Sequence, residues 1–569
     1  MHLIENTHRH DEHQPREMAR TRRTSRVGRR LRSCVCLASR LASRIASRLA
    51  LRLALIVCSV AAGVIVGGAR ADFIPERVLI LADDAGQGGA IQKFADIGFT
   101  LNPTVDYTLF QITRYEIDPP PTAADIPILR AVLDSLIGSN TIESGDFDIP
   151  VAVETGQGQT GSIWVSCLGF PNFYGQYGST AVGAPFAAER GYGQGVRIGI
   201  VDSGLVPNAP VSEALSASFG YACANGVATL GVIPRDIGDG IDQNGVNGPD
   251  EGVGHGTFVA GIASLVAPGA RHIHLKVLDD EGMCFLSDVL AALQACIEEN
   301  VHVVNLSLVP SAPTDILACA IHILRNSGAI VVACAGNDPN MTNRYYPAVP
   351  NSNCTSANDT DLIQVGASTF GDGFWSQGAM GTWVDLFAPG VTNYNGFQLP
   401  IPGESLLGPI GYDSQTQSAC FASASGTSFS AAWVSGAAAC WRAAYGTLPG
   451  GGIAADQISG LFLADARQTG TAIGGTSSKR LNAAALVALT GGAPQCPPDI
   501  VPNFDPITGE YVYSIDAADL SAALGLWGLK AVDPRQIFRA DLDGDGTIGA
   551  IDLGTLLGIW GNVPPNPCP

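Results

Sequence analysis

The chain has 569 residues, and this length predicts about three to four domains rather than a single hydrophobic core. Hydrophobic residues make up 46% of it and charged residues 15%, which fits a globular protein with ample core. The 52 Asp and Glu residues outnumber the 32 Lys and Arg residues, so the formal net charge is −20. Because nucleic acids and anionic membranes attract positive charge, this balance argues against both as partners.

Residues 1–71 carry the pattern of a secretory signal. They hold 14 Arg and 4 acidic residues, and an arginine recurs every four residues over positions 40–52. An uncharged apolar run follows over residues 53–69 and ends in an Ala-Arg-Ala site at residues 69–71. We therefore predict export, cleavage after this site, and no stable membrane span afterwards, since a spanning helix needs about 20 apolar residues. A retained membrane anchor is the alternative.

Export makes the cysteine count informative, because disulfides persist outside the cytoplasm. Three of the 14 cysteines lie in the signal region, and the remaining eleven form an odd number. At least one of them is therefore unpaired or pairs between chains. No Cys-x-x-Cys motif is present, which argues against a zinc site, and the pairing stays open.

Residues 72–155 predict a small ferredoxin-like α+β domain. The pattern in chain order is strand, helix, strand, helix and a last extended piece, at residues 77–82, 90–99, 107–116, 124–139 and 147–154. This is a split β-α-β order. Gly-rich stretches follow, so residues 156–190 are predicted to be a linker and processing region.

Residues 191–490 alternate between short apolar strands and helices. The expected strands are VRIGIVDS, RHIHLKVL, VHVVNLSL, AIVVACAG and LIQVGAST, and LSDVLAALQACIEE is a typical helix between them. Continuous apolar strands separated by helices are typical of a parallel sheet with helices on both faces. The fold class predicted for this domain is therefore α/β.

Four polar residues follow strands or begin helices of this domain. Asp202 ends VRIGIVD, His255 begins a helix, Asn337 follows AIVVACAG, and Ser428 opens a helix of small residues. Ligands of such sheets bind beyond the carboxyl ends of the strands, so these side chains are expected to meet. An acid, a base and a hydroxyl in the order Asp, His, Ser, with an amide donor between, fit a serine hydrolase.

The blocks VRIGIVDSG, GHGTFVAG, VVNLSL, VVACAGN, DLFAPGV and SGTSFSAAWVSG resemble, in order and spacing, the signature motifs of the subtilisin-like serine peptidases, or subtilases. The resemblance covers residues 175–490 and implies that Ser428 is the nucleophile, His255 the general base and then acid, and Asp202 the group that orients His255. It also implies an oxyanion hole made by Asn337 and the Ser428 N–H. The substrate-binding residues that it implies are Ser307, Leu308, Val309, Cys334, Ala335 and Gly336.

Two positions depart from the family pattern. Ala432-Trp433 stands where the family has a Pro and a His, and Val309-Pro310 stands where it has Gly-Gly. The second change lies on the edge that pairs with a peptide substrate, which leaves peptide affinity and side-chain preference open. The 72–155 domain resembles the inhibitory, folding-assisting propeptide of secreted subtilases. It implies a zymogen that cuts itself between about Val151 and Gly191.

An acidic, glycine-rich loop precedes His255. It contains Asp239, Asp242, Asn244 and Asp250, closely spaced oxygen ligands of the kind that suit a structural Ca²⁺. A solvated acidic loop without a metal is the alternative. No cofactor is expected for catalysis itself.

The C-terminal part has a Pro-rich linker over residues 491–506 and an internal repeat within residues 507–569. The second copy contains DLDGDGTIGAID, which matches an EF-hand calcium loop with Asp in place of the last Glu. Its predicted ligands are Asp541, Asp543, Asp545, Thr547 and Asp552. The repeat resembles a helical dockerin-type module, which implies a cohesin-like or cell-surface partner.

The predicted function is that of a secreted or cell-surface serine endopeptidase, made as a zymogen and stabilised by calcium, with protein or peptide substrates. Two alternatives stay open. One is a catalytically silent subtilase-fold protein that binds or scaffolds through its dockerin-like module, and the departures at Val309-Pro310 and Ala432-Trp433 keep it in play. The other is an esterase that uses the same triad.

Overall fold

The computed structural model describes residues 74–153 and much of the chain from residue 176 to residue 489. The described residues are 74–153, 176–184, 187, 193–206, 220–231, 235–243, 250–340, 362–369, 371–391, 406–413, 418–445, 454–489, 503–505, 510–512 and 553. The predicted signal region and the EF-hand-like loop from Asp541 to Asp552 lie outside them.

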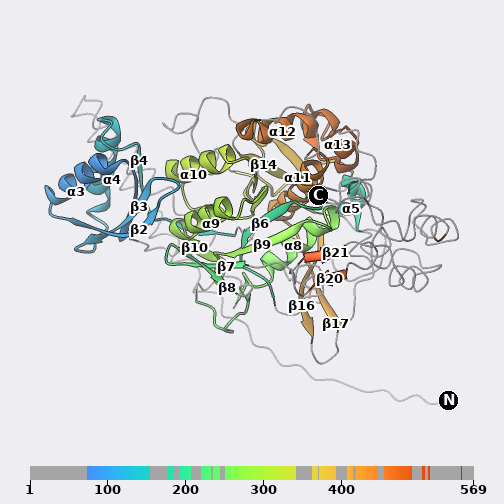
Figure 1. The fold of residues 1–569 in the computed structure, drawn as a ribbon, viewed down its shortest axis with the longest axis horizontal. Coiled ribbons are helices and arrows are strands. Elements are labelled where there is room, and N and C mark those ends of the chain that lie inside the picture. Colours follow the sequence, from blue (N-terminus) through green and yellow to red (C-terminus); the bar gives the residue numbers. More distant parts are fainter. Residues whose placement is uncertain are drawn as a thin grey trace, which may run out of the picture. The chain divides into compact units, whose positions relative to one another are not determined.

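The N-terminal α+β unit, residues 77–147, is a four-stranded antiparallel sheet with two helices (Figure 1). Its elements are β1 (Arg77–Leu81), α3 (Asp84–Ala95), β2 (Thr100–Tyr107), β3 (Ile112–Asp118), α4 (Ile126–Gly138) and β4 (Ser144–Phe147), in the strand order β2-β3-β1-β4. This β-α-β-β-α-β order is that of a ferredoxin-like unit. Its core includes Val78, Ile80 and Phe94, all fully buried.

The single strand predicted over residues 107–116 is wrong. β2 ends at Tyr107 and β3 begins only at Ile112, and between them Gln111 adopts a left-handed backbone with φ of 57°. Because apolar residues stand on both sides of this short turn, the two strand ends resemble one continuous alternating strand. The last extended piece also divides, into β4 and β5 (Pro150–Ala152), which belong to different sheets.

The central domain is built on a ten-stranded sheet of order β18-β19-β15-β14-β13-β11-β6-β9-β7-β8. The strands are β6 (Arg197–Asp202), β7 (Gly220–Ala224), β8 (Val227–Gly231), β9 (Arg271–Lys276), β11 (Val303–Leu306), β13 (Ile330–Cys334), β14 (Ile363–Ser368), β15 (Leu386–Pro389), β18 (Thr471–Ala472) and β19 (Lys479–Arg480). From β19 to β7 neighbouring strands run parallel, whereas the edge strands β18 and β8 pair antiparallel. The predicted parallel sheet is confirmed.

Helices cover both faces of this sheet (Figure 1). They are α8 (His255–Val266), α9 (Leu286–Glu298), α10 (Asp315–Asn326), α11 (Thr427–Tyr445), α12 (Ile458–Thr469) and α13 (Ala483–Leu489). Successive residues of β13 point to opposite faces: Ile330 and Val332 belong to the core with α8 and α11, and Val331 to the core with α9 and α10. A strand buried on both faces has no polar side to alternate, which explains its uninterrupted apolar sequence.

Small residues let α8 and α11 pack closely. A Cβ atom added to Gly436 of α11 would lie 2.6 Å from the Ala263 carbonyl oxygen of α8, closer than any side chain tolerates. Ala432, Ala437 and the other alanines nearby are fully buried. The run of small residues after Ser428 therefore lets two helices approach closely, and each helix carries a predicted catalytic residue in its first turn, His255 in α8 and Ser428 in α11.

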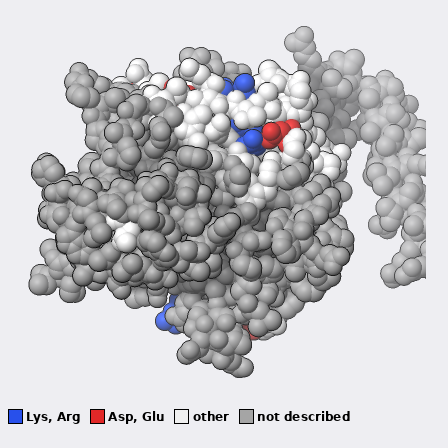
Figure 2. Space-filling model, turned by 90° about the vertical axis from the view of Figure 1, so that its right-hand side faces the viewer, with Lys and Arg blue, Asp and Glu red and all other residues white. Residues whose placement is uncertain are grey.

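The described part of the surface carries no strong positive patch on the face drawn in Figure 2. There the described atoms are mostly uncharged, and only a few basic side chains are visible, one of them beside an acidic one. Within the described ranges, no helix is both long and apolar enough to cross a membrane.

The described cysteines are mostly buried thiols. Cys319 is disulfide-bonded, and the cysteines that keep a thiol are Cys223, Cys284, Cys296, Cys334 and Cys440. Burial raises the pKa of Cys223 to about 12, so this thiol stays protonated and unreactive at neutral pH.

Two buried histidines of β9 predict acid sensitivity. His272 and His274 are at most 1% exposed, and their ring nitrogens have no hydrogen-bond partner among the described residues. Burial lowers the pKa of His272 to about 4. Between about pH 6.5 and pH 4 the imidazole is therefore protonated in the unfolded chain but neutral in the folded chain. Stability should therefore fall as the pH drops from about 6.5 towards about 4.

The variant His272→Leu removes one of these titrating groups. We expect the unfolding free energy of this variant, measured by urea titration, to fall less between pH 7.5 and pH 5 than that of the unmodified chain, by about 2 kcal/mol. Equal pH dependence of the two midpoints would contradict the assignment of a neutral buried imidazole.

Candidate active site

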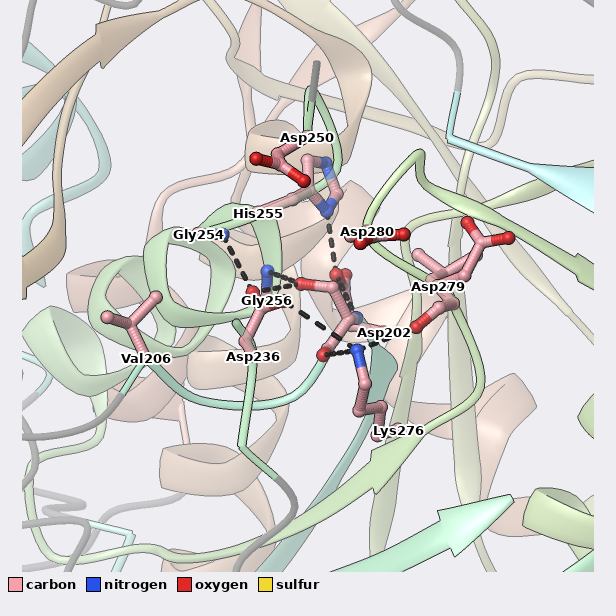
Figure 3. A network of polar contacts seen from close by, with 12 residues as sticks. Asp202, Val206, Asp236, Asp250, Gly254, His255, Gly256, Lys276, Asp279 and Asp280 are labelled. Atoms are coloured by element: carbon pink, nitrogen blue, oxygen red, sulfur yellow. Dashed lines mark hydrogen bonds and ion pairs between the residues drawn. The ribbon is translucent and has the colours of Figure 1, made fainter. Parts of the chain in front are cut away.

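The ends of β6 and α8 bring an acid and a base together. Asp202 is the last residue of β6 and fully buried, and His255 is the first residue of α8. The His255 Nδ1 lies 2.8 Å from the Asp202 Oδ1, as Figure 3 shows. The Ser203 N–H also donates to this Oδ1, at 2.7 Å. The carboxylate therefore has a fixed orientation towards the ring, and the ring presents Nε2 on its other side.

The electrostatics of His255 favour its protonated form. Burial lowers the pKa of His255, but the Asp202 carboxylate and its hydrogen bond oppose this, with a smaller contribution from Asp236, and the net pKa is raised. A base of this kind takes a proton readily from a hydroxyl and holds it as an imidazolium.

The first turn of α11 contains the Ser428 hydroxyl and fixes the orientation of the Asn337 side-chain amide. Ser428 is the second residue of the helix and almost fully buried. Thr427, before it, donates its N–H and its hydroxyl to the Asn337 Oδ1, each at 2.9 Å, and accepts the Gly336 N–H at 3.1 Å. The amide oxygen faces Thr427, and the donor nitrogen, Asn337 Nδ2, lies beside Gly426, whose added Cβ would lie 3.5 Å from it.

The two helix starts meet through Phe429. Its ring, one residue after Ser428, lies 5.7 Å from the His255 ring and 4.2 Å from the Phe258 ring of α8, measured between centroids. The N–H groups at the start of a helix favour negative charge nearby. A hydroxyl, a base, a buried acid and an amide donor thus gather at one edge of the sheet, an arrangement that can carry out nucleophilic acyl transfer.

Comparison with known proteins agrees with this geometry. The sequence model of the subtilase family, peptidase S8, matches residues 193–481, which include the acid, the base, the amide and the hydroxyl. The chain belongs to the subtilase family. It is therefore a serine-type endopeptidase with a subtilisin-like α/β fold.

Several characterised subtilases are similar to the central domain. Subtilisin BL from Lederbergia lenta is 29% identical over 273 residues, which cover 46% of this chain and 82% of that protein. Thermitase from Thermoactinomyces vulgaris is 28% identical over 230 residues, 39% of this chain and 72% of that one. The crystal structure of fervidolysin from Fervidobacterium pennivorans matches with a TM-score of 0.51 at 15% identity, covering 74% of this chain and 62% of that one, and shows the shared fold.

The N-terminal α+β unit leads into a strand that inserts into the catalytic domain of this subtilase. β5 lies between β10 (Met283–Phe285) and β12 (Val309–Pro310) and pairs antiparallel with both. The Val153 N–H donates to the Gly282 carbonyl at 3.0 Å, and the Ser311 N–H donates to the Pro150 carbonyl at 2.9 Å. Val151 and Val153 are buried in the core of the catalytic domain.

The strands β10 and β12 form the two edges of the groove that β5 fills, and both edges connect to predicted catalytic residues. On one edge β12 follows Ser307, whose hydroxyl donates to the Ser428 carbonyl at 2.9 Å. On the other edge, Gly282 precedes β10 and packs against Gly252 so closely that a Cβ added to Gly252 would lie 2.3 Å from the Gly282 N. The Gly252 carbonyl in turn accepts the His255 N–H. A chain that lies between the edges therefore runs towards Ser428 and His255.

Of the predicted substrate-binding residues, Ser307 and Val309 lie at or beside β12, and Cys334 ends β13. Ser307, Leu308, Val309, Cys334, Ala335 and Gly336 are all buried. Val309 pairs with Ala152 although it replaces a family glycine, and Ser311 supplies the N–H that Pro310 lacks. The departure at Val309-Pro310 thus leaves strand pairing intact.

The second departure lies inside the core. Ala432 and Trp433 are both fully buried, and the Trp433 Nε1 has no hydrogen-bond partner among the described residues. The large indole takes its place in the core beneath the nucleophile, beside α8.

The structure groups Asp239 and Asp250 of the predicted acidic loop with a third carboxylate, Asp280. Carboxylate oxygens of Asp239, Asp250 and Asp280 lie within 4.8 Å of one another, and the Asp239 N–H donates to both Asp250 and Asp280. Asp242 is not part of this group, and Asn244 lies outside the described residues. Sequence reasoning missed Asp280 because it follows the distant strand β9, and only folding brings it to the loop.

Proposed function

We propose that this subtilase cuts peptide bonds with Ser428, His255 and Asp202. The Ser428 Oγ attacks the peptide carbonyl carbon while His255 takes its proton, and Asp202 stabilises the imidazolium that forms. Asn337 and the Ser428 N–H donate to the oxygen that becomes negative. His255 then returns the proton to the leaving amine, and water repeats the sequence on the acyl-enzyme. The 2.8 Å contact between His255 and Asp202 carries the assignment.

Labelling with a fluorophosphonate, followed by mass spectrometry, tests this function. The reagent should form one adduct, on the peptide that contains Ser428, because only an activated serine reacts at a useful rate. Hydrolysis of peptide substrates as well as simple esters separates an endopeptidase from an esterase. A folded, processed chain that takes no label would instead support a silent binding protein.

We propose further that the chain is secreted as a zymogen and that the N-terminal α+β unit is its inhibitor. The insertion of β5 into the groove supports this, since a chain segment there excludes a substrate from the same edge. Asp148 adds a second contact: it is buried and accepts the N–H and the hydroxyl of Ser287, at the start of α9, both at 2.8 Å. The Tyr107 hydroxyl donates to the Ser287 carbonyl at 2.9 Å.

The register of β5 suggests which bond is cut. Ala152 pairs with Val309, and Ser307, which touches Ser428, stands two residues before Val309. In an antiparallel pair, moving two residues forward along one strand corresponds to moving two residues back along the other. The residue that lies two positions after Ala152 is therefore expected opposite Ser307. In this chain that position is Glu154, so we propose Glu154–Thr155 as the bond that self-processing cuts.

We propose a structural calcium ion at the group formed by Asp239, Asp250 and Asp280. Three carboxylates this close repel one another unless a cation lies between them, and oxygen ligands suit Ca²⁺. Glu281 lies beside this group: it accepts the Asp250 N–H at 3.2 Å, and its buried Oε2 has no hydrogen-bond partner among the described residues. The ion would hold the loop before His255 to the loop after β9.

Calcium should therefore raise the thermal midpoint of the inactive variant Ser428→Ala, in which autolysis is absent. At 100 times its dissociation constant a bound ion adds about 2.7 kcal/mol, which corresponds to a shift of about 5 to 10 °C. Adding Asp280→Asn should abolish most of this response, whereas Asp456→Asn, an exposed acid elsewhere, should leave it unchanged. A thermal midpoint of Ser428→Ala that changes neither with added calcium nor with EDTA would contradict the proposed calcium site.

The signal region and the dockerin-like module complete the proposal. Export of the chain rests on the pattern of residues 1–71, and attachment to a cohesin-like or cell-surface partner rests on the repeat within residues 507–569. Calcium binding by the loop from Asp541 to Asp552 would order that module.

A further inference from the structure

A buried carboxylate that touches no substrate lies behind the catalytic pair. Asp236 is 1% exposed and belongs to the loop between β8 and α8. Its Oδ2 accepts two hydrogen bonds, from the Ser203 hydroxyl and from the Gly254 N–H, both at 2.7 Å (Figure 3). One partner follows Asp202 and the other precedes His255, so this oxygen lies at the junction of the two catalytic elements.

Ser203 extends the link. Its hydroxyl oxygen accepts the Gly256 N–H at 3.0 Å while its own N–H holds the Asp202 Oδ1. The start of α8 has no capping side chain of its own, because its N-cap is Gly254, with φ of 89°. The first N–H groups of a helix need acceptors, and here Asp236 and Ser203 supply them from elsewhere in the chain.

Lys276 secures the arrangement from the side of β9. Its ammonium donates to the Ser203 carbonyl at 2.7 Å and to the Leu278 carbonyl at 2.8 Å, and lies 3.7 Å from the Asp236 Oδ1. Burial raises the pKa of Asp236 above its usual value, and the Asp202 charge adds to this, while Lys276 and the hydrogen bonds from Ser203 and Gly254 lower it in part. The ammonium and the two donors thus offset part of the cost of burying the ionised carboxylate.

We infer that Asp236 is a positioning residue for proton transfer, which holds the His255 ring against Asp202 through Ser203 and the start of α8. Its negative charge also stabilises the imidazolium that forms when His255 takes the Ser428 proton. The charged groups that act on His255 are Asp202 from β6 and Asp236 from its loop, and α11 presents the uncharged Phe429 ring. The inference rests on the proposed triad.

The variant Asp236→Asn tests both effects. With turnover counted per fluorophosphonate-labelled site, we expect kcat to fall by about tenfold to 100-fold and KM to change less than about twofold, because the chemistry is misaligned while the groove is untouched. The pKa of His255 should fall without this charge, so the acidic limb of kcat/KM should move to lower pH. Assays in excess calcium hold the Asp239, Asp250 and Asp280 group constant.

Two companion variants separate positioning from stability. Ser203→Ala breaks the link but keeps the charge, so kcat should fall while the acidic limb stays in place. Asp385→Asn removes a carboxylate that accepts the Gln364 N–H and pairs with Arg467, far along the sheet, and should change neither. If Asp236→Asn and Ser203→Ala had the same kcat per labelled site and the same acidic limb as Asp385→Asn, the inference would be overturned. An unmodified enzyme without label would refute the triad instead.

Discussion

The variant Ser428→Ala is expected to be secreted uncut and inactive. It lacks the nucleophile, so peptide turnover should fall by about 10⁶-fold, a magnitude taken from subtilisin itself. Because we propose that the same site cuts its own chain, the N-terminal α+β unit should stay attached in this variant. Intact-mass spectrometry should give the full exported mass for Ser428→Ala and a chain that starts at Thr155 for the unmodified protein.

Ser430→Ala is the matched control. Ser430 lies two residues further along α11, is equally buried, and donates to the Ala388 carbonyl at 3.0 Å. Its loss removes one hydrogen bond, about 1 kcal/mol of stability, but no catalytic group, so processing and labelling should persist. Complete processing of purified Ser428→Ala would show that another peptidase makes the cut.

The variant Asn337→Asp should lose most of the rate while it keeps the local structure. The carboxylate that it introduces retains an oxygen to accept from Thr427 but has no N–H to offer to the oxyanion. Loss of one such donor lowers kcat by about 10²–10³-fold, as measured in subtilisin, and the added negative charge opposes the developing oxyanion further. KM should change little, because the donor acts mainly in the transition state.

Steady-state kinetics on a peptide substrate, normalised to fluorophosphonate-labelled sites, measures this effect. Asn482→Asp makes the same amide-to-acid change at the start of α13, where the side chain accepts the Ala485 N–H. That variant should match the unmodified enzyme. An unchanged kcat for Asn337→Asp would remove Asn337 from the oxyanion hole.

The apolar strands made the parallel sheet predictable. β11 and β13 have neighbours and helices on both sides, so nearly every side chain is apolar and the pattern is unmistakable. The β2–β3 hairpin was not predictable in the same way. Its turn has no Gly or Pro, and Gln111 adopts a left-handed backbone that sequence patterns assign to glycine or asparagine.

Some residues of the candidate site could likewise be predicted from the sequence, and others could not. Asp202, His255, Asn337 and Ser428 stand in motifs that place each beside a strand end or a helix start, so their meeting could be expected from the sequence. Asp236 and Asp280 stand in acidic loops where nothing distinguishes them from solvent-exposed neighbours. Only the folded chain shows that Asp236 is buried behind His255 and that Asp280 approaches Asp250.

By itself the sequence determined the family and the α/β class and predicted the catalytic groups, because these depend on short motifs and on local periodicity. The tertiary structure decided which residues support them. Capping of α8 by Asp236, orientation of the Asn337 amide by Thr427 and occupation of the groove by β5 each join segments far apart in the chain. Such contacts are set by how loops and strand edges come together, and no local pattern of residues encodes that.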